Sequence, residues 1–243
     1  GWFALFSIPS LILLRDLPRP ARSPAAPSVW VLGLRRYRDT LRGIRAYHNL
    51  VRFLLAYFFY NNAVVTIIVF AVAFAHTSLA FTMTENIVLV VVMNVIAAPG
   101  AYGFGWIAAR IGSKRTIVIA LGMWLAVTAG TEIAVWPGLF TVAGAKSLFW
   151  GVAALASLSI GAIQATSRAF VGQLAPAGRS GEFFGFMAFA GKGAAVLGPL
   201  VFGLASDAFD SQRVAVLTIG AFFLAGLLLL LPVADPRRGR SGR

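Results

Sequence analysis

Six stretches of mainly apolar residues, each of membrane-spanning length, set the fold class of this chain. They run at about 52–75, 85–108, 116–136, 147–168, 182–205 and 212–233 of the 243 residues. A helix needs about 20 residues to cross a hydrocarbon core of about 30 Å. Charged residues make up only 12% of the chain, against about 25% in soluble domains. The sequence therefore predicts an all-α polytopic membrane protein with a six-helix bundle over 52–233.

The remaining segments flank this bundle. Residues 1–14 are apolar but too short to span, at about 21 Å, and they lack the basic region of a signal peptide. We interpret them as the tail of a truncated transmembrane helix, so that the chain is the C-terminal part of a longer protein. Residues 15–51 form a basic, proline-rich loop, and residues 234–243 form a basic tail.

Within the loop, residues 34–53 have the spacing of an amphipathic helix, with arginines opposite an apolar face. Such a helix either lies on an anionic leaflet or packs on the cytoplasmic ends of the protein's own helices. The sequence leaves both interpretations open.

Positive charge follows the predicted topology. If loop 15–51 is cytoplasmic, alternation of the spans places 18 of the 21 cations on that side. This is the positive-inside bias, so the net charge of +13 indicates orientation and not nucleic-acid binding. Short loops and many alanines and arginines favour a bacterial cytoplasmic membrane over a vacuolar or other endomembrane.

The chain has few of the residues that catalytic sites use. The chain has no cysteine, and its two histidines, His48 and His76, are far apart in sequence. No paired carboxylates fall within the spans. We therefore expect no metal site, no cofactor and no enzymatic activity.

Four amide side chains lie inside the predicted spans. Asn61 and Asn62 are in the first span, Asn94 is in the second and Gln164 is in the fourth. Each one could simply form an interhelical hydrogen bond. Because several occur at similar depth on different helices, a shared polar cavity is the alternative that we favour.

Lys192 lies near the centre of the fifth span, about 15 Å from Glu182 along a helix axis. Ala190, Ala194 and Gly198 form a stripe of small residues that allows a neighbouring helix to approach closely. Lys192 is about 200° away from that stripe and shares its face with Ala195, and also with Pro199 and Gly203. We expect it to face water, a ligand's negative group or a structural carboxylate elsewhere in the bundle.

Glu182 begins the same span on the cytoplasmic side. Arg168 or Arg110 could pair with it, either as a cytoplasmic gate or as ordinary charges at helix ends.

The loop after the second span resembles a family motif. Residues 105–115 read GWIAARIGSKR and are similar to the major facilitator signature Gly-x-x-x-Asp-Arg-x-Gly-x-Lys/Arg. Gly105, Arg110, Gly112, Lys114 and Arg115 match, whereas Ala109 stands at the aspartate position. Gly198, Pro199 and Gly203 in 191–203 resemble the glycine–proline helix of that superfamily.

A narrower resemblance covers nearly the whole chain. The stretches FLLAYFFYNN (53–62), QATSR (164–168), APAGRSGEFFGF (175–186) and the GK and LGPLVFG blocks within 191–203 resemble the autophagy-related vacuolar amino-acid effluxers and their bacterial relatives. That family usually has an aspartate where this chain has Asn62.

The resemblance implies the C-terminal half of a twelve-helix transporter that works by alternating access. The implied partners are a small solute, with amino-acid efflux as the implied activity, the lipid bilayer and the missing N-terminal half. Lys192 and the four amides would contact the solute, and Arg110, Lys114 and Arg115 would lie in the cytoplasmic loop. A non-transporting scaffold of the same fold is the alternative, because acids are missing at Ala109 and Asn62.

Overall fold

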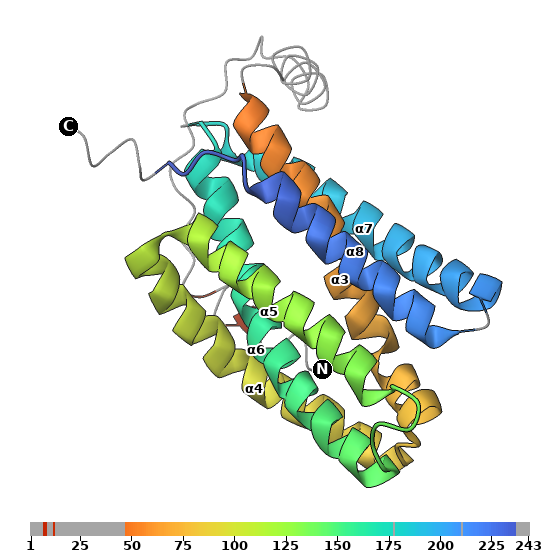
Figure 1. The fold of residues 1–243 in the computed structure, drawn as a ribbon. Helices are drawn as coiled ribbons and strands as arrows, with labels where there is room; N and C mark the ends of the chain where they lie inside the picture. The colour runs from red at the N-terminus through yellow and green to blue at the C-terminus, as the bar shows by residue number, and fades with distance from the viewer. Residues whose placement is uncertain (1–6, 9–11, 13–46, 177, 210, 237–243) are drawn as a thin grey trace. The chain divides into compact units, whose positions relative to one another are not determined.

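The computed structural model describes residues 7, 8, 12, 47–176, 178–209 and 211–236 (Figure 1). The predicted helix tail at 1–14, most of the loop at 15–51 and its amphipathic helix, and most of the tail at 234–243 lie outside these residues. Gly1–Gly43 and Ile44–Arg243 are separate compact units, and every helix described below belongs to the second.

Six long helices follow one another, and each predicted span lies on one of them. They are α3 (His48–Leu79), α4 (Met83–Ile111), α5 (Ser113–Ala134), α6 (Val142–Leu174), α7 (Ser180–Phe209) and α8 (Gln212–Leu230). All six are long and apolar enough to cross a membrane, by length and composition. The prediction of an all-α polytopic membrane protein is confirmed.

The helix ends follow local chemistry. A capping box begins α4, because the Thr82 hydroxyl accepts from the Glu85 amide while the Glu85 carboxylate accepts from the Thr82 amide. Gly112 alone separates α4 from α5, and its φ of 96° is in the region that favours glycine. The helices α5 and α8 stop at Ala134 and Leu230, short of the predicted 136 and 233. Pro137 and Pro232 follow closely, and a proline has no backbone N–H with which to continue the helical hydrogen bonds.

The bundle consists of two groups of three helices, α3–α7–α8 and α4–α5–α6. The most extensive contacts join α4 to α6, α3 to α8, α5 to α6, and α3 to α7. Exchanging α3 with α6, α4 with α7, and α5 with α8 leaves this set of pairs unchanged. The bundle is therefore arranged as an internal repeat.

Glycines allow the two equivalent crossings to come within backbone contact. A Cβ on Gly100 of α4 would lie 2.6 Å from the Leu158 carbonyl oxygen of α6, and one on Gly161 of α6 would overlap Ala97 of α4. At the α3–α7 crossing, a Cβ on Gly198 would lie 2.5 Å from the Asn62 carbonyl oxygen. Both crossings therefore depend on the absence of a side chain.

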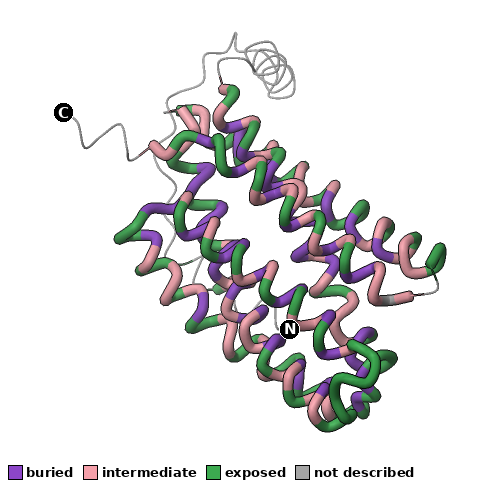
Figure 2. The backbone as a smooth tube through the Cα atoms, in the orientation of Figure 1, coloured by how far each residue is buried: buried purple, intermediate pink, exposed green. Residues whose placement is uncertain are grey.

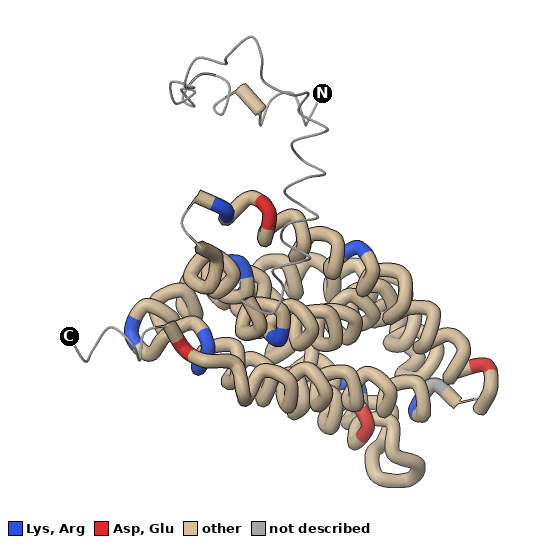
Figure 3. Tube along the Cα trace, turned by 90° about the horizontal axis from the view of Figure 1, so that it is seen from above, with Lys and Arg blue, Asp and Glu red and all other residues tan. Residues whose placement is uncertain are grey.

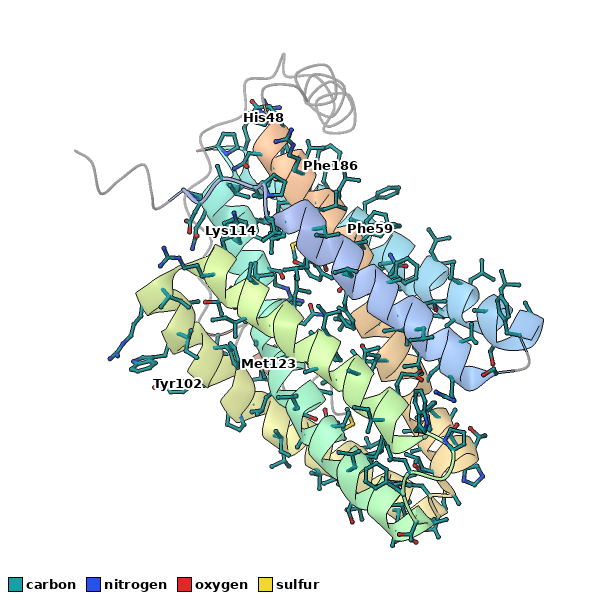
Figure 4. The ribbon with its side chains drawn as sticks, viewed as in Figure 1. His48, Phe59, Tyr102, Lys114, Met123 and Phe186 are labelled. Carbon is teal, nitrogen blue, oxygen red and sulfur yellow. The ribbon has the colours of Figure 1, made fainter. Side chains whose placement is uncertain are left out.

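The core lies where the helices face one another (Figure 2). Trp124 of α5 and Phe223 of α8 are buried and stack with ring centroids 5.0 Å apart. The outward side of α4 is apolar and exposed, and Tyr102 projects away from the neighbouring helices (Figure 4). Helices α4 and α7, which exchange places in the repeat, are the two with the smallest buried share of their spanning windows.

Candidate functional site

The two ends of the bundle differ in charge, and most of the length between them is uncharged (Figure 3). One end, called the basic end below, holds the starts of α3, α5 and α7 and the finishes of α4, α6 and α8. Among the described residues, six cations and two acids lie toward it: Arg52, Arg110, Lys114, Arg115, Arg168 and Arg179, with Glu182 and Asp235. The opposite end holds Lys146 and Arg213, with Glu85, Glu132 and Asp207.

Both cations at the opposite end are paired with carboxylates of another helix. Lys146 of α6 contacts Glu85 of α4 at 2.8 Å, and Arg213 of α8 contacts Glu132 of α5 at 3.3 Å. These pairs join adjacent helix ends, so the cations there have structural partners.

At the basic end, the α4–α5 turn is tied to two other helices. Lys114 donates to the Leu231 carbonyl oxygen at 2.7 Å, just beyond the last turn of α8. The dipole of α8 also stabilises a cation at this end of the helix. Ser113 accepts from Gln173 of α6 at 2.9 Å. The Arg110 guanidinium lies 3.5 Å from the ring centroid of Trp106 on its own helix. Gly105 and Arg115 are exposed, and Gly112 is buried.

Glu182 pairs with Arg179, and not with Arg168 or Arg110. The Arg179 Nη2 lies 2.8 Å from the Glu182 carboxylate, and Arg179 Nη1 donates to the Tyr47 hydroxyl at 3.0 Å. The Glu182 carboxylate holds the pKa of the Arg179 guanidinium above its usual value. Arg179 is three residues before Glu182, so this ion pair is local to the start of α7. Through the Tyr47 hydroxyl, Arg179 also connects the start of α7 to the residue before α3.

The small-residue stripe of α7 faces its neighbours, and Lys192 does not. Ala194 and Gly198 are buried and Ala190 is half-buried, whereas Lys192 and Ala195 are exposed. Pro199 and Gly203 are half-buried. Within the described part of the chain, Lys192 has no carboxylate or other hydrogen-bond partner.

Beside Lys192, the polar side chains of α3 reach the surface of α7. A Cβ on Gly191 would lie 3.2 Å from the Tyr57 hydroxyl oxygen and 3.9 Å from Asn61 Nδ2. Asn61 is only 5% exposed, and its amide makes no hydrogen bond to any described residue. The absence of a side chain at Gly191 leaves both polar groups uncovered on that side.

Helix α6 adds a second cation, Arg168. It follows Ser167, whose hydroxyl lies 2.7 Å from that of Tyr60, three residues after Tyr57 on α3. The Arg168 guanidinium is close enough to Tyr57 for a Coulombic interaction, is exposed, and has no partner among the described residues. Gln164 is half-buried one helical turn before it, on the same side of α6. We call Tyr57, Asn61, Arg168, Gly191 and Lys192 the α3–α6–α7 cluster.

A buried hydroxyl chain holds α3 against α6 behind this cluster. The Tyr60 hydroxyl lies 2.7 Å from Ser167 Oγ, and Ser167 Oγ donates to the Ile163 carbonyl oxygen at 2.5 Å. Because the serine hydroxyl has a single proton, Tyr60 is the donor of the first bond.

The other two amides lie apart from the cluster. Asn62 is fully buried at the α3–α7 crossing, where its Nδ2 donates to the Phe58 carbonyl oxygen and its Oδ1 has no partner. It therefore has no exposed surface to offer a solute in this conformation. Asn94 is exposed on α4, and its amide donates to the Val90 carbonyl oxygen of its own helix.

Tyr57 and Gly191 are the members that sequence reasoning did not identify. The available signal was spacing, since Tyr57 is four residues before Asn61 and therefore on the same side of α3. Gly191 carried no comparable signal, because its role depends on which helix packs against it. In the described part of the chain, no three metal-ligating side chains come together.

Six helices of spanning length, arranged as an internal repeat, define a polytopic membrane protein, and such repeats are common in transporters. Comparison with known families is more specific: residues 1–242 match the family described as "Vacuole effluxer Atg22 like". The chain belongs to this family.

Curated relatives agree with this assignment. The chain is 28% identical over 236 residues to an uncharacterized MFS-type transporter, YxiO, of Bacillus subtilis, which covers 97% of this chain and 52% of the relative. It is 27% identical over 254 residues to autophagy-related protein 22 of Kluyveromyces lactis, covering 98% of this chain and 50% of that protein. The chain thus spans about half the length of these relatives.

Proposed function

We propose that this chain is the C-terminal half of a secondary transporter that moves a small solute by alternating access, with an amino acid as the solute class. The observation that carries the proposal is Lys192. It lies about 18 Å along α7 from Ser180, and it is exposed and unpaired among the described residues. A charge at such depth costs about 2.5–3.5 kcal/mol on insertion scales. A functional contact explains why the cost is tolerated.

The relatives support transport as the activity. One is named as an MFS-type transporter, and the matching family is described as effluxers. In transporters built from repeats, the solute binds near the bilayer midplane between two halves that rock against each other. Lys192 would meet the solute in that space, with Asn61 and Gln164 beside it, and Asn94 and Asn62 would contribute in other conformations.

The charge of the two ends supports an orientation. With six cations and two acids toward the basic end, the positive-inside bias places that end in the cytoplasm. The end of α4 and the start of α5, with Gly105, Arg110, Gly112, Lys114 and Arg115, would then lie at the cytoplasmic side of the rocking interface. Arg168 and Glu182 would lie toward the same side.

Counterflow in proteoliposomes tests this proposal with the complete protein. Vesicles loaded with unlabelled L-amino acids should accumulate a ¹⁴C-labelled L-amino acid mixture above the level of protein-free vesicles. Lys192→Gln should reduce this flux at least about tenfold, since a charge-assisted contact is worth about 1.5–3 kcal/mol. Arg52→Gln is the control, because Arg52 is an exposed cation near the start of α3 outside the cluster.

Two results would contradict the proposal. Equal flux through the parent protein and Lys192→Gln would remove Lys192 from the solute path. No flux in any variant would favour the alternative, a non-transporting protein of the same fold, which Ala109 at the aspartate position of the signature loop also favours.

A further inference from the structure

Two cations of the α3–α6–α7 cluster lie deeper than the ends of their helices. Arg168 is six residues before the end of α6 and Lys192 is twelve residues after the start of α7. These separations correspond to about 9 and 18 Å along the helix axes. Both side chains are exposed, and neither has a carboxylate partner within the part of the chain that the structure describes.

Tyr57 of α3 interacts with both of the helices that carry these cations, α6 and α7. Its hydroxyl oxygen is 3.2 Å from the Cβ position of Gly191, the residue before Lys192, and it is close enough to Arg168 for a Coulombic interaction. A tyrosine hydroxyl can donate a hydrogen bond to an anion. A donor of α3 therefore lies beside the residue before Lys192 and within electrostatic range of Arg168.

Asn61 supplies a further donor, which has no hydrogen-bond partner among the residues that the structure describes. The residue is 5% exposed, and its polar atoms are not among the fully buried ones, so the amide can be reached. Its Nδ2 is 3.9 Å from the Cβ position of Gly191, on the side where α7 has no side chain. An acceptor that reached past Gly191 would satisfy this amide.

We propose that Lys192, Arg168, the Tyr57 hydroxyl and the Asn61 amide form a subsite for the carboxylate of the transported solute, and that Gly191 keeps it open. This inference rests on the proposed transport function and specifies which group of the solute the protein binds. The solute must carry a carboxylate, so the corresponding amides and amines are excluded. Arginine suits this task because its planar fork matches a carboxylate, while lysine supplies a point charge.

Solute chemistry gives the first test, in counterflow by the complete protein. Unlabelled L-amino acids should inhibit uptake of the labelled mixture, and their carboxamides should be weaker by about tenfold to a hundredfold, as expected for losing a charge-assisted contact. Arg168→Gln should abolish most of this preference, and Arg52→Gln should keep it. Carboxamides that inhibit as well as the acids would overturn the subsite.

Gly191 is tested by a substitution that changes no charge. Gly191→Ala places a methyl group against Tyr57 and over Asn61, and should raise the KM for the amino-acid mixture about tenfold while leaving expression unchanged. Gly185→Ala is the matched control on α7, because a Cβ there meets no atom within 4 Å. Equal KM values for the two variants would contradict the role of Gly191.

A measurement that does not depend on transport distinguishes this inference from the proposed function. These 243 residues contain no cysteine, and Ala195 is exposed one helical turn from Lys192. In the complete protein, with any other cysteines replaced by serine, Ala195→Cys should react faster with an anionic methanethiosulfonate than with a cationic one. The ratio of the two rates should fall several-fold on adding Arg168→Gln, because opposite charges in a confined site concentrate the reagent.

The two readouts are then interpreted together. A charge-selective Ala195→Cys without any amino-acid flux would mean that the anion subsite exists and the proposed function is wrong. Flux with a rate ratio that Arg168→Gln leaves unchanged would mean that the protein transports and the subsite is wrong.

Discussion

Two polar residues at the α3–α6 contact, Tyr60 and Ser167, contribute unequally to the stability of the fold. Tyr60 donates to Ser167, and Ser167 donates onward to the Ile163 carbonyl oxygen. Tyr60 and Ser167 are both buried. Removing the tyrosine hydroxyl leaves the serine satisfied, whereas removing the serine hydroxyl strands a buried tyrosine O–H.

This asymmetry predicts the order of two substitutions. Tyr60→Phe should lower the free energy of unfolding by about 0.6 kcal/mol, the average for an interhelical hydrogen bond in a membrane. Ser167→Ala should cost about 1–3 kcal/mol, because it leaves a buried donor without a partner. Unfolding of the complete protein in detergent micelles measures both, and Tyr60→Phe as the costlier change would contradict the assigned direction of the bond.

The short side chains of Asn61 and Asn62 point in different directions from α3, and this limited what sequence could predict about the site. Asn61 and Asn62 are about 100° apart around α3. Asn61 lies beside Gly191, whereas Asn62 is buried where Gly198 approaches. Depth along a helix could be estimated from the chain, but the choice between the two asparagines depends on the helix that packs against them.

At the scale of helices, the position of each span was predictable because the thickness of the membrane fixes its length. The exact ends were not, since they depend on capping by Thr82, on Gly112 and on the prolines after α5 and α8. Pairing between helices was also out of reach. The stripe at Ala190, Ala194 and Gly198 predicted a close approach, but nothing in it identified α3 as the neighbour.

The α4–α6 crossing should fail when a methyl group is added. Gly161→Ala overlaps the backbone of Ala97, so the helices must separate, and overpacking of this kind costs about 1–3 kcal/mol. Gly151→Ala on the same helix meets no atom within 4 Å, and should be neutral or gain up to about 1 kcal/mol from helix propensity. Equal unfolding free energies for the two variants would show that the crossing is looser than described.

At the scale of the whole molecule, the orientation of the bundle can be measured directly. Arg115 is exposed at the basic end, and Leu139 is exposed in the turn at the opposite end. In intact cells, a membrane-impermeant thiol reagent should label Leu139→Cys and spare Arg115→Cys, since the positive-inside bias places the basic end in the cytoplasm. The reverse pattern would invert the topology.

Alternating access requires the surface around Lys192 to be accessible from each side of the membrane in turn, and this requirement is the most direct test of the proposed function. The measurement is the rate at which Ala195→Cys of the complete protein reacts with an impermeant thiol reagent applied to each side of sealed vesicles. We predict reaction from both sides, each slowed by the L-amino acid mixture, because this face of α7 opens in turn to the two compartments. Reaction from neither side would place Lys192 against lipid or protein, and would contradict a solute path past it.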